Sequence, residues 1–241
     1  MSFLIICGVT CGFVMVAARF IKAVPWLWYG AALALDFVYA YGVVYSLPPE
    51  VLRVLSVVMQ RGMLATSLFV IVMYCGVFSE RSFVHRTVAP IRAELSLIAC
   101  ILILAHCLNY LSSYLGVLGT NVAAINSNQL ASFIAALVLC ILLLVLGVTS
   151  VKVLKRRMNA SVWKNIQRSS YVFFGLIYVH ELLVLYPAAL KGAGDALITC
   201  IVGGIVFGSY YVLRLVRYLT DRRENDTGAF VESQRGREIG A

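Results

Sequence analysis

The feature that most constrains this chain is a long interval without formal charge. Between Leu95 and Val151 the sequence has no Asp, Glu, Lys or Arg. That interval has room for two membrane-spanning helices, each of which needs about 20 mainly apolar residues. Over all 241 residues only 13% are charged and 61% are hydrophobic, whereas a soluble domain is about one quarter charged. The sequence therefore predicts an all-α, multi-pass transmembrane helix bundle.

Apolar runs bounded by charged flanks predict about seven spans. The first of them lacks the basic start and the small-residue cleavage site of a signal peptide, so we interpret it as a retained span. The predicted helices cover roughly residues 3–18, 26–46, 62–79, 95–116, 130–149, 169–187 and 196–216.

Lysine and arginine gather on alternate connections between these helices. Of the 20 basic residues, 17 lie in connections 1–2, 3–4 and 5–6 or after the last helix, and the opposite connections hold only Arg53, Arg61 and Lys191. Basic residues stay on the cytoplasmic side of a membrane. The N-terminus is therefore expected outside and the C-terminus in the cytoplasm. The net charge of +9 is explained by topology, and no nucleic-acid partner is expected.

The chain divides into three predicted parts. Residues 1–25 are interpreted as an additional N-terminal span, 26–218 as the main membrane domain and 219–241 as a polar cytoplasmic tail. The sequence has no glycine-rich nucleotide-binding motif, so we expect no NAD(P)H domain in it. Its seven cysteines form no CxxC or CxxCH motif, which indicates neither a zinc site nor a disulfide framework.

Two of the three histidines lie deep inside predicted spans. His106 follows Arg92 by 14 residues, or about 21 Å of helix, and His180 follows Arg168 by 12 residues, or about 18 Å. Both helices start at the cytoplasmic side, so the two imidazoles are expected at one level, past the midplane. Two such imidazoles could ligate one haem iron, although neutral imidazoles bonded to neighbouring helices remain the alternative. His85, in a basic connection, is expected to be solvated.

Two segments around these histidines carry a family resemblance. In LGVTSVKVLKRRMNASVWKNIQRSSYVFFGLIYVHELL (146–183), a Thr-Ser follows an apolar helix, and then come paired arginines, a Trp-Lys and an aromatic helix that reaches His180. RAELSLIACILILAHCLNYL (92–111) reaches His106 in a similar way. Both resemble the ferric reductase-like transmembrane family. Within it they are most similar to the MsrQ-like haem-binding subunits of the bacterial periplasmic protein-methionine-sulfoxide reductase system. The similarity covers about residues 60–217.

The resemblance implies that His106 and His180 are the axial ligands of one haem b. The family also tends to have an inner pair of histidines, but the corresponding positions here hold Gln167 and either Arg92 or Ala93. We therefore expect a single haem, in the outer half of the membrane. Four basic residues match the family's basic loop, and we interpret them as topology anchors rather than contacts to flavin or haem propionates: Lys152, Arg156, Arg157 and Lys164.

By the same resemblance, the chain is expected to be an electron-transfer subunit in a bacterial cytoplasmic (inner) membrane. It would take electrons from membrane quinol, or from a flavin such as FMN supplied by a cytoplasmic flavin reductase. It would deliver them to an extracytoplasmic oxidoreductase partner. Because only an outer haem is expected, a donor site within the membrane is favoured.

The sequence also allows two other functions for this chain. The chain could be a haem-free transporter or channel that uses His106, His180 and Asp36, or a seven-helix receptor or assembly protein without a cofactor. Asp36 is a carboxyl inside a span, with Tyr39, Tyr41 and Tyr45 nearby, so it has either a structural hydrogen bond or a role in a quinol or proton site. Glu181 directly follows His180 and is expected to point about 100° away from it.

Overall fold

The computed structural model describes residues 2–45, 47–120 and 125–239 of the chain, with the side chains of 43–45 and 223–239 left aside. The described residues form helices and turns and no strand. In chain order the elements are α1 (Ser2–Ala23), α2 (Pro25–Tyr45), α3 (Pro49–Leu55), the π-helical turn η1 (Ser56–Gln60), α4 (Met63–Tyr74), α5 (Phe83–Val88), the 3-10 turn η2 (Ala89–Ile91), α6 (Arg92–Leu102), α7 (Leu104–Thr120), α8 (Ser127–Ser150), α9 (Lys152–Arg157), α10 (Ala160–Leu190) and α11 (Gly194–Ile239).

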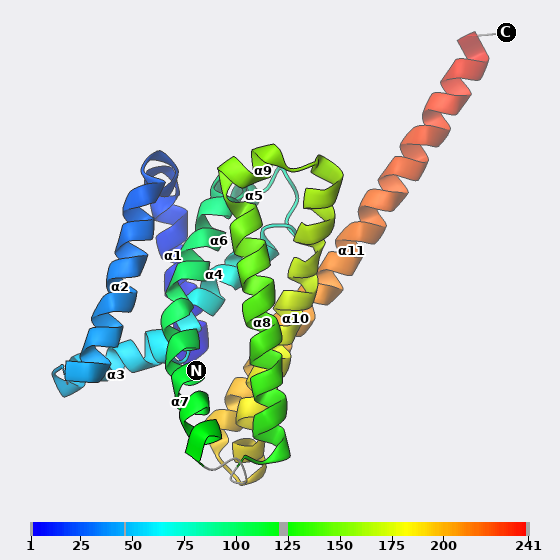
Figure 1. Cartoon of the computed structure of the whole chain (residues 1–241). Coiled ribbons are helices and arrows are strands. Elements are labelled where there is room, and N and C mark those ends of the chain that lie inside the picture. Colours follow the sequence, from blue (N-terminus) through cyan, green and yellow to red (C-terminus); the bar gives the residue numbers. More distant parts are fainter. Residues whose placement is uncertain (1, 46, 121–124, 240–241) are drawn as a thin grey trace.

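The helices are stacked side by side in a bundle whose turns lie at two opposite ends (Figure 1). Six helical stretches of the described chain are long and apolar enough to cross a membrane: Ser2–Ala23, Pro49–Tyr74, Phe83–Thr120, Ser127–Ser150, Ala160–Leu190 and Gly194–Arg222. The 21 residues of α2 run beside them and are about 31 Å long, which also matches a bilayer. The predicted all-α, multi-pass membrane bundle is confirmed, with about seven crossings.

The third crossing was predicted over 62–79, and α4 begins next to that start, at Met63. The continuous apolar stretch around it begins earlier, at Pro49, and adds α3 and η1, of which α3 lies across the bundle (Figure 1). The bond from the Arg61 N–H to the Ser56 carbonyl, at 3.3 Å, closes the π turn, and Gly62 then takes a left-handed conformation with φ 63°. This break divides the span into two parts. Two basic residues, Arg53 and Arg61, gave the first part the sequence pattern of a connection.

Two other helices extend beyond their predicted ends. α10 was expected to start at 169 but begins at Ala160, where the Asn159 side chain accepts a hydrogen bond from the Ser161 N–H. Such a cap satisfies an N–H that has no partner within the helix. α11 was expected to end near 216 but continues to Ile239, well beyond the other helices (Figure 1).

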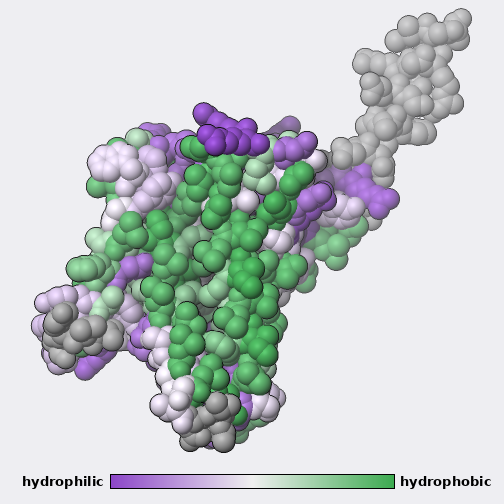
Figure 2. Space-filling model, in the orientation of Figure 1, coloured by the Kyte–Doolittle hydropathy of each residue, from purple (hydrophilic) through white to green (hydrophobic). Residues whose placement is uncertain are grey.

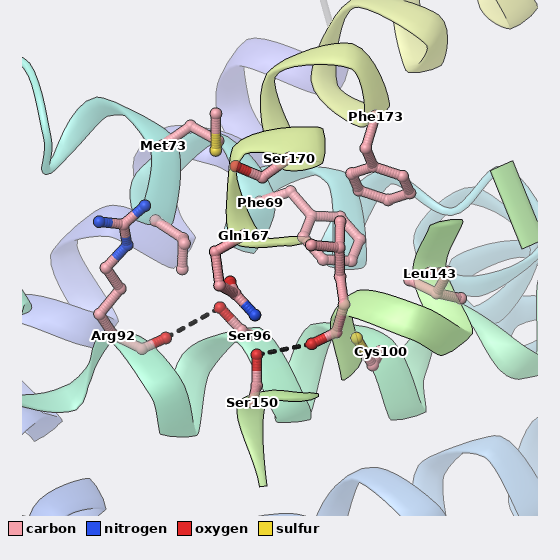
Figure 3. Close-up of a pocket in the computed structure, with 12 residues that line it drawn as sticks. Phe69, Met73, Arg92, Ser96, Cys100, Leu143, Ser150, Gln167, Ser170 and Phe173 are labelled. Atoms are coloured by element: carbon pink, nitrogen blue, oxygen red, sulfur yellow. Dashed lines mark hydrogen bonds between the residues drawn. The ribbon is translucent and has the colours of Figure 1, made fainter. Parts of the chain in front are cut away.

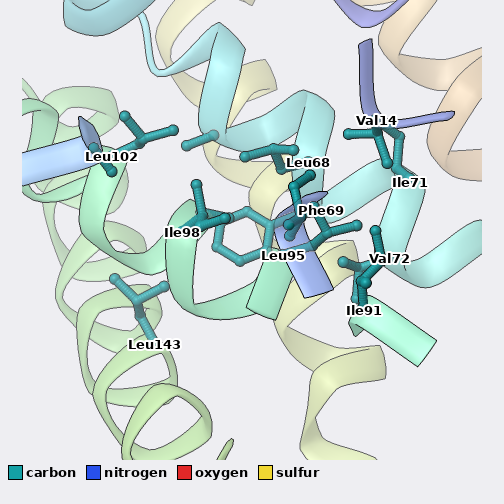
Figure 4. Close-up of a cluster of buried hydrophobic side chains, with 14 of the residues drawn as sticks. Val14, Leu68, Phe69, Ile71, Val72, Ile91, Leu95, Ile98, Leu102 and Leu143 are labelled. Atoms are coloured by element: carbon teal, nitrogen blue, oxygen red, sulfur yellow. The ribbon is translucent and has the colours of Figure 1, made fainter. Parts of the chain in front are cut away.

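The centre of the bundle is α4, which is buried on nearly every side. Its buried residues run almost without interruption from Ser67 to Met73. Leu68, Phe69 and Val72 of α4 meet Leu95 and other residues of α6 (Figure 4). A helix that is apolar all round belongs in an interior. By contrast, α8 exposes a row of leucine, isoleucine and valine side chains that suits contact with lipid.

A buried carboxylate joins three elements at the end of the bundle that carries α9. Glu94 of α6 is 1% exposed. Its Oε1 lies 2.9 Å from the Lys152 Nζ of α9 and 3.5 Å from the Lys22 Nζ of α1. Lys22 Nζ also donates to the carbonyl of Pro90. Burial of a carboxylate is costly without such partners.

We predict that the two lysines compensate for one another. Lys22→Met or Lys152→Met alone should lower the free energy of unfolding by less than about 1 kcal/mol, because each pair is partly solvated and the other lysine remains. The double variant leaves the buried carboxylate of Glu94 unpaired and should cost about 3 kcal/mol. Thermal unfolding in detergent measures this, with Lys164→Met as the control for charge. Simple addition of two small effects would contradict the prediction.

Candidate functional site

His106 lies on α7 and makes a defined hydrogen bond. Its Nδ1 is 2.5 Å from the backbone carbonyl oxygen of Gln60, at the end of η1. A carbonyl can only accept, so Nδ1 carries the proton and Nε2 keeps its lone pair. The ring also packs against Tyr110, with centroids 4.9 Å apart. Metal-bound histidines commonly show this arrangement, in which one ring nitrogen donates to a carbonyl and the other binds the metal.

The break in the third span makes this bond available. The carbonyl of Gln60 is free because the helix ends there, and helix ends leave carbonyls without partners inside the helix. Gly62 brings the backbone close to α7: a Cβ at this position would lie 2.7 Å from Ile103 Cδ1 and 3.6 Å from His106 Nδ1. The glycine therefore provides both the left-handed turn and the close approach.

His180 on α10 is held in the same way. Its Nδ1 lies 3.2 Å from the backbone carbonyl oxygen of Ser132 on α8 and 3.4 Å from the Ser132 hydroxyl oxygen. Ser132 is 3% exposed, so this contact is buried. With the proton on Nδ1, Nε2 of His180 is also left with its lone pair. The matching carbonyl partners on both histidines could not be foreseen from the sequence, since a backbone carbonyl has no residue signature.

The two imidazoles lie on separate helices, α7 and α10. Both side chains are partly buried. α6 and α7 run in the same direction as α10, and all three start toward the end of the bundle that carries α5 and α9 (Figure 1). This shared direction was expected for the two helices that carry the histidines. Within the described residues, no group of three or more His, Cys, Asp or Glu side chains lies together. A pair of imidazoles can serve an iron porphyrin, which needs only two axial ligands from the protein.

His85 occupies a different part of the molecule. It lies on the short helix α5, near the end that carries α9 (Figure 1). Its backbone N–H donates to the Ser82 hydroxyl, which caps the helix. The structure therefore places His85 on a different element from the other two histidines, with a partly buried side chain.

The inner half of the bundle has a small cavity with a mixed apolar and polar lining, which includes the two positions where the family's inner histidines were expected (Figure 3). Both Arg92 and Gln167 line it, together with Ser96, Ser150 and Ser170. Its volume is about 60 Å³, which is room for about two water molecules. Gln167 donates through Nε2 to the Thr149 hydroxyl at 3.0 Å, so it connects α10 to α8. The residues here give iron no nitrogen ligand of the usual kind.

Two acidic residues, Glu181 and Asp36, were expected inside the spans. Glu181 faces α11, because a Cβ on Gly203 would lie 2.9 Å from its Oε2. This agrees with the direction expected for the residue after His180. Asp36 on α2 has a buried Oδ1 that finds no hydrogen-bond partner among the described residues.

The basic loop forms the hydrophilic end of the bundle. Figure 2 shows hydrophilic residues gathered at that end, above an apolar band that crosses the middle of the same face. Lys152 pairs with Glu94, and Lys155 lies over the Trp163 ring at 4.1 Å from its centroid. Both contacts anchor the loop and support its interpretation as a topology signal.

These features define an all-α, multi-pass membrane protein with two carbonyl-anchored imidazoles inside the bundle. Residues 61–178 match the family described as "Ferric reductase like transmembrane component". This match supports the family for that segment. The segment includes His106 and ends two residues before His180.

A relative from Treponema pallidum (strain Nichols), which is named "Uncharacterized protein", is 33% identical to this chain over 171 residues. The alignment covers 71% of this chain and 47% of the relative, so the chain spans about half the relative's length. No solved structure matches the chain at a significant level.

The geometry predicts a specific need for glycine at position 62. Gly62→Ala should lower the free energy of unfolding by about 1–2 kcal/mol, because an L side chain is strained in the left-handed conformation. The matched control is Gly116→Ala on α7, where a Cβ meets nothing within 4 Å and stability should be unchanged or higher. Thermal unfolding of the two variants measures the difference. Equal stability of the two would contradict the role of the turn.

Proposed function

We propose that the chain is a haem b electron-transfer subunit of an oxidoreductase system. His106 and His180 would hold the haem iron through their Nε2 atoms. The observation that carries this proposal is the matched placement of the two imidazoles: each has Nδ1 within hydrogen-bond distance of a backbone carbonyl, and the tautomer that donates to it leaves Nε2 for a metal. The bound haem would supply one-electron chemistry inside the membrane.

The two carbonyls set the orientation of the rings. Gln60 belongs to the third span and Ser132 to α8, so each histidine is positioned by a helix other than its own. A hydrogen bond to a backbone carbonyl also makes a ligating imidazole a stronger donor to iron.

A single haem per chain is proposed. The inner positions hold Arg92 and Gln167, and Gln167 is occupied by its bond to Thr149. Neither side chain is a usual axial ligand. Electrons must therefore reach the outer half of the membrane from a donor other than an inner haem.

The donor is membrane quinol or a flavin such as FMN from a cytoplasmic flavin reductase. The acceptor is an extracytoplasmic oxidoreductase, as for MsrQ-like subunits of the bacterial inner membrane. The family match over residues 61–178 and the multi-pass architecture support this proposal. The basic end with α9 faces the cytoplasm under the positive-inside rule, which turns the histidine level toward the outside.

The ligand assignment predicts loss of haem on removal of either imidazole. His106→Ala and His180→Ala should each abolish the low-spin haem b bands in reduced-minus-oxidised spectra of purified protein. His85→Ala, on α5, should leave the bands unchanged. Intact bands in either of the first two variants would overturn the assignment, and a colourless wild-type protein would favour a haem-free transporter or receptor.

The single-haem proposal makes its own prediction. A pyridine haemochrome assay should give about one haem per chain, since one pair of axial histidines is available. Gln167→Leu should leave both the stoichiometry and the bands unchanged, because Gln167 bonds Thr149 rather than iron. Two haems per chain, or loss of haem in this variant, would refute the interpretation of the inner half.

A further inference from the structure

One face of α2 carries polar atoms for which the fold provides no partner. Trp28 Nε1, Asp36 Oδ1 and Tyr39 OH are buried and make no hydrogen bond to the described residues. Trp28, Asp36 and Tyr39 are spaced by eight and three residues, which places them on one side of a helix together with the buried Ala32. Buried polar groups are nearly always hydrogen-bonded, so three unbonded groups on one side of a single helix need an explanation.

These groups reach the level of the histidine pair. Asp36 lies 11 residues after Pro25, or about 17 Å from the start of α2, and Tyr39 lies about 21 Å from it. His106 is about 21 Å from Arg92, measured from the same end of the bundle. Asp36 and Tyr39 therefore lie in the middle and outer half of the bilayer, whereas Trp28 lies near the start of α2.

Tyr110 connects the α2 face to His106. Tyr39 is 2% exposed, and its helix packs against α7, which carries Tyr110. Tyr110 in turn packs its ring on the imidazole of His106. A molecule that bonded to Asp36 and Tyr39 would thus lie beside α7, close to the residue proposed to bind iron.

The chemistry of the two side chains defines the ligand. A carboxylate accepts a hydrogen bond from a hydroxyl, and a phenol donates to an oxygen, so the pair complements an aromatic ring with hydroxyl or carbonyl oxygens. At this depth the ligand must dissolve in hydrocarbon, which excludes a flavin nucleotide with its charged phosphate. Leu33, Phe37 and Val38 are exposed on α2, so the site is bordered by lipid-facing residues.

We propose that Asp36 and Tyr39 form a binding site for the headgroup of a quinol or quinone that enters from the bilayer. Asp36 accepts a hydrogen bond from one ring hydroxyl, and Tyr39 donates to a ring oxygen, with Tyr110 as the aromatic neighbour. The physiological meaning of the site rests on the proposed electron-transfer function, but binding itself does not.

The test is equilibrium binding of decylubiquinone and menadione to the full chain in nanodiscs, with an azido-quinone for crosslinking and peptide mapping. Asp36→Asn and Tyr39→Phe should each weaken binding about tenfold, as expected for loss of a hydrogen bond to a buried polar partner. The control Tyr41→Phe, on the same helix but 46% exposed and stacked on Phe37, should bind like the wild type.

The crosslink should map to α2 or α7 in the unmodified protein. A crosslink elsewhere, or unchanged binding in the Asp36→Asn/Tyr39→Phe double variant, would overturn the proposal even if some single variants fail to fold. Haem bands are recorded on the same samples. Retained bands without quinone binding reject only the quinone site, whereas quinone binding to a colourless wild type rejects only the haem proposal.

Discussion

Inside a bilayer no water is available to a polar N–H, so a buried imidazole depends on an acceptor from the protein itself. In this chain both deep histidines meet that demand with a backbone carbonyl of another helix, and the other ring nitrogen is left without such a bond. The same constraint favours the tautomer with the proton on Nδ1, which leaves Nε2 for the proposed iron. For His106, the carbonyl that meets this demand lies next to the break at Gly62.

The two carbonyls become available by different means. Gln60 ends η1, and the left-handed Gly62 after it frees the carbonyl from the helix. Ser132 instead lies within the unbroken α8, so its carbonyl accepts from His180 through a second lone pair. The bond of His106 therefore uses a distorted span, whereas the bond of His180 uses a regular helix. The distortion of the third span is thus specific to the side of the site that holds His106.

Much of the fold could be predicted from the sequence because hydrocarbon allows few alternatives. The charge-free interval after Leu95 and the distribution of basic residues gave the class of fold and the number of crossings. The common depth expected for the two histidines rests on helix rise from Arg92 and Arg168 and stays a prediction. The segments α3 and η1 before α4 were missed, since Arg53 and Arg61 resemble connection residues. The carbonyl partners were missed as well, because every residue has a carbonyl and sequence cannot single one out.

The polar groups of the inner half and of α2 differ in a way that bears on the route of electrons. In the inner half Gln167 is bonded to Thr149, and the cavity beside it has room only for water-sized molecules. On α2, Asp36 and Tyr39 are left without partners. A satisfied polar cluster stabilises a bundle, whereas an unsatisfied one is tolerated where a ligand completes it.

α7 is the element on which these features converge. Its inner turn meets Gly62 and the Gln60 carbonyl through His106, and one turn further on Tyr110 packs on the His106 ring. Because α2 packs against α7, a donor at α2 would lie beside the helix that carries the proposed ligand. The distance across the inner half would no longer matter, because an electron that enters from the bilayer starts at the level of the histidines. The absence of an inner histidine pair is therefore compatible with electron transfer by this chain.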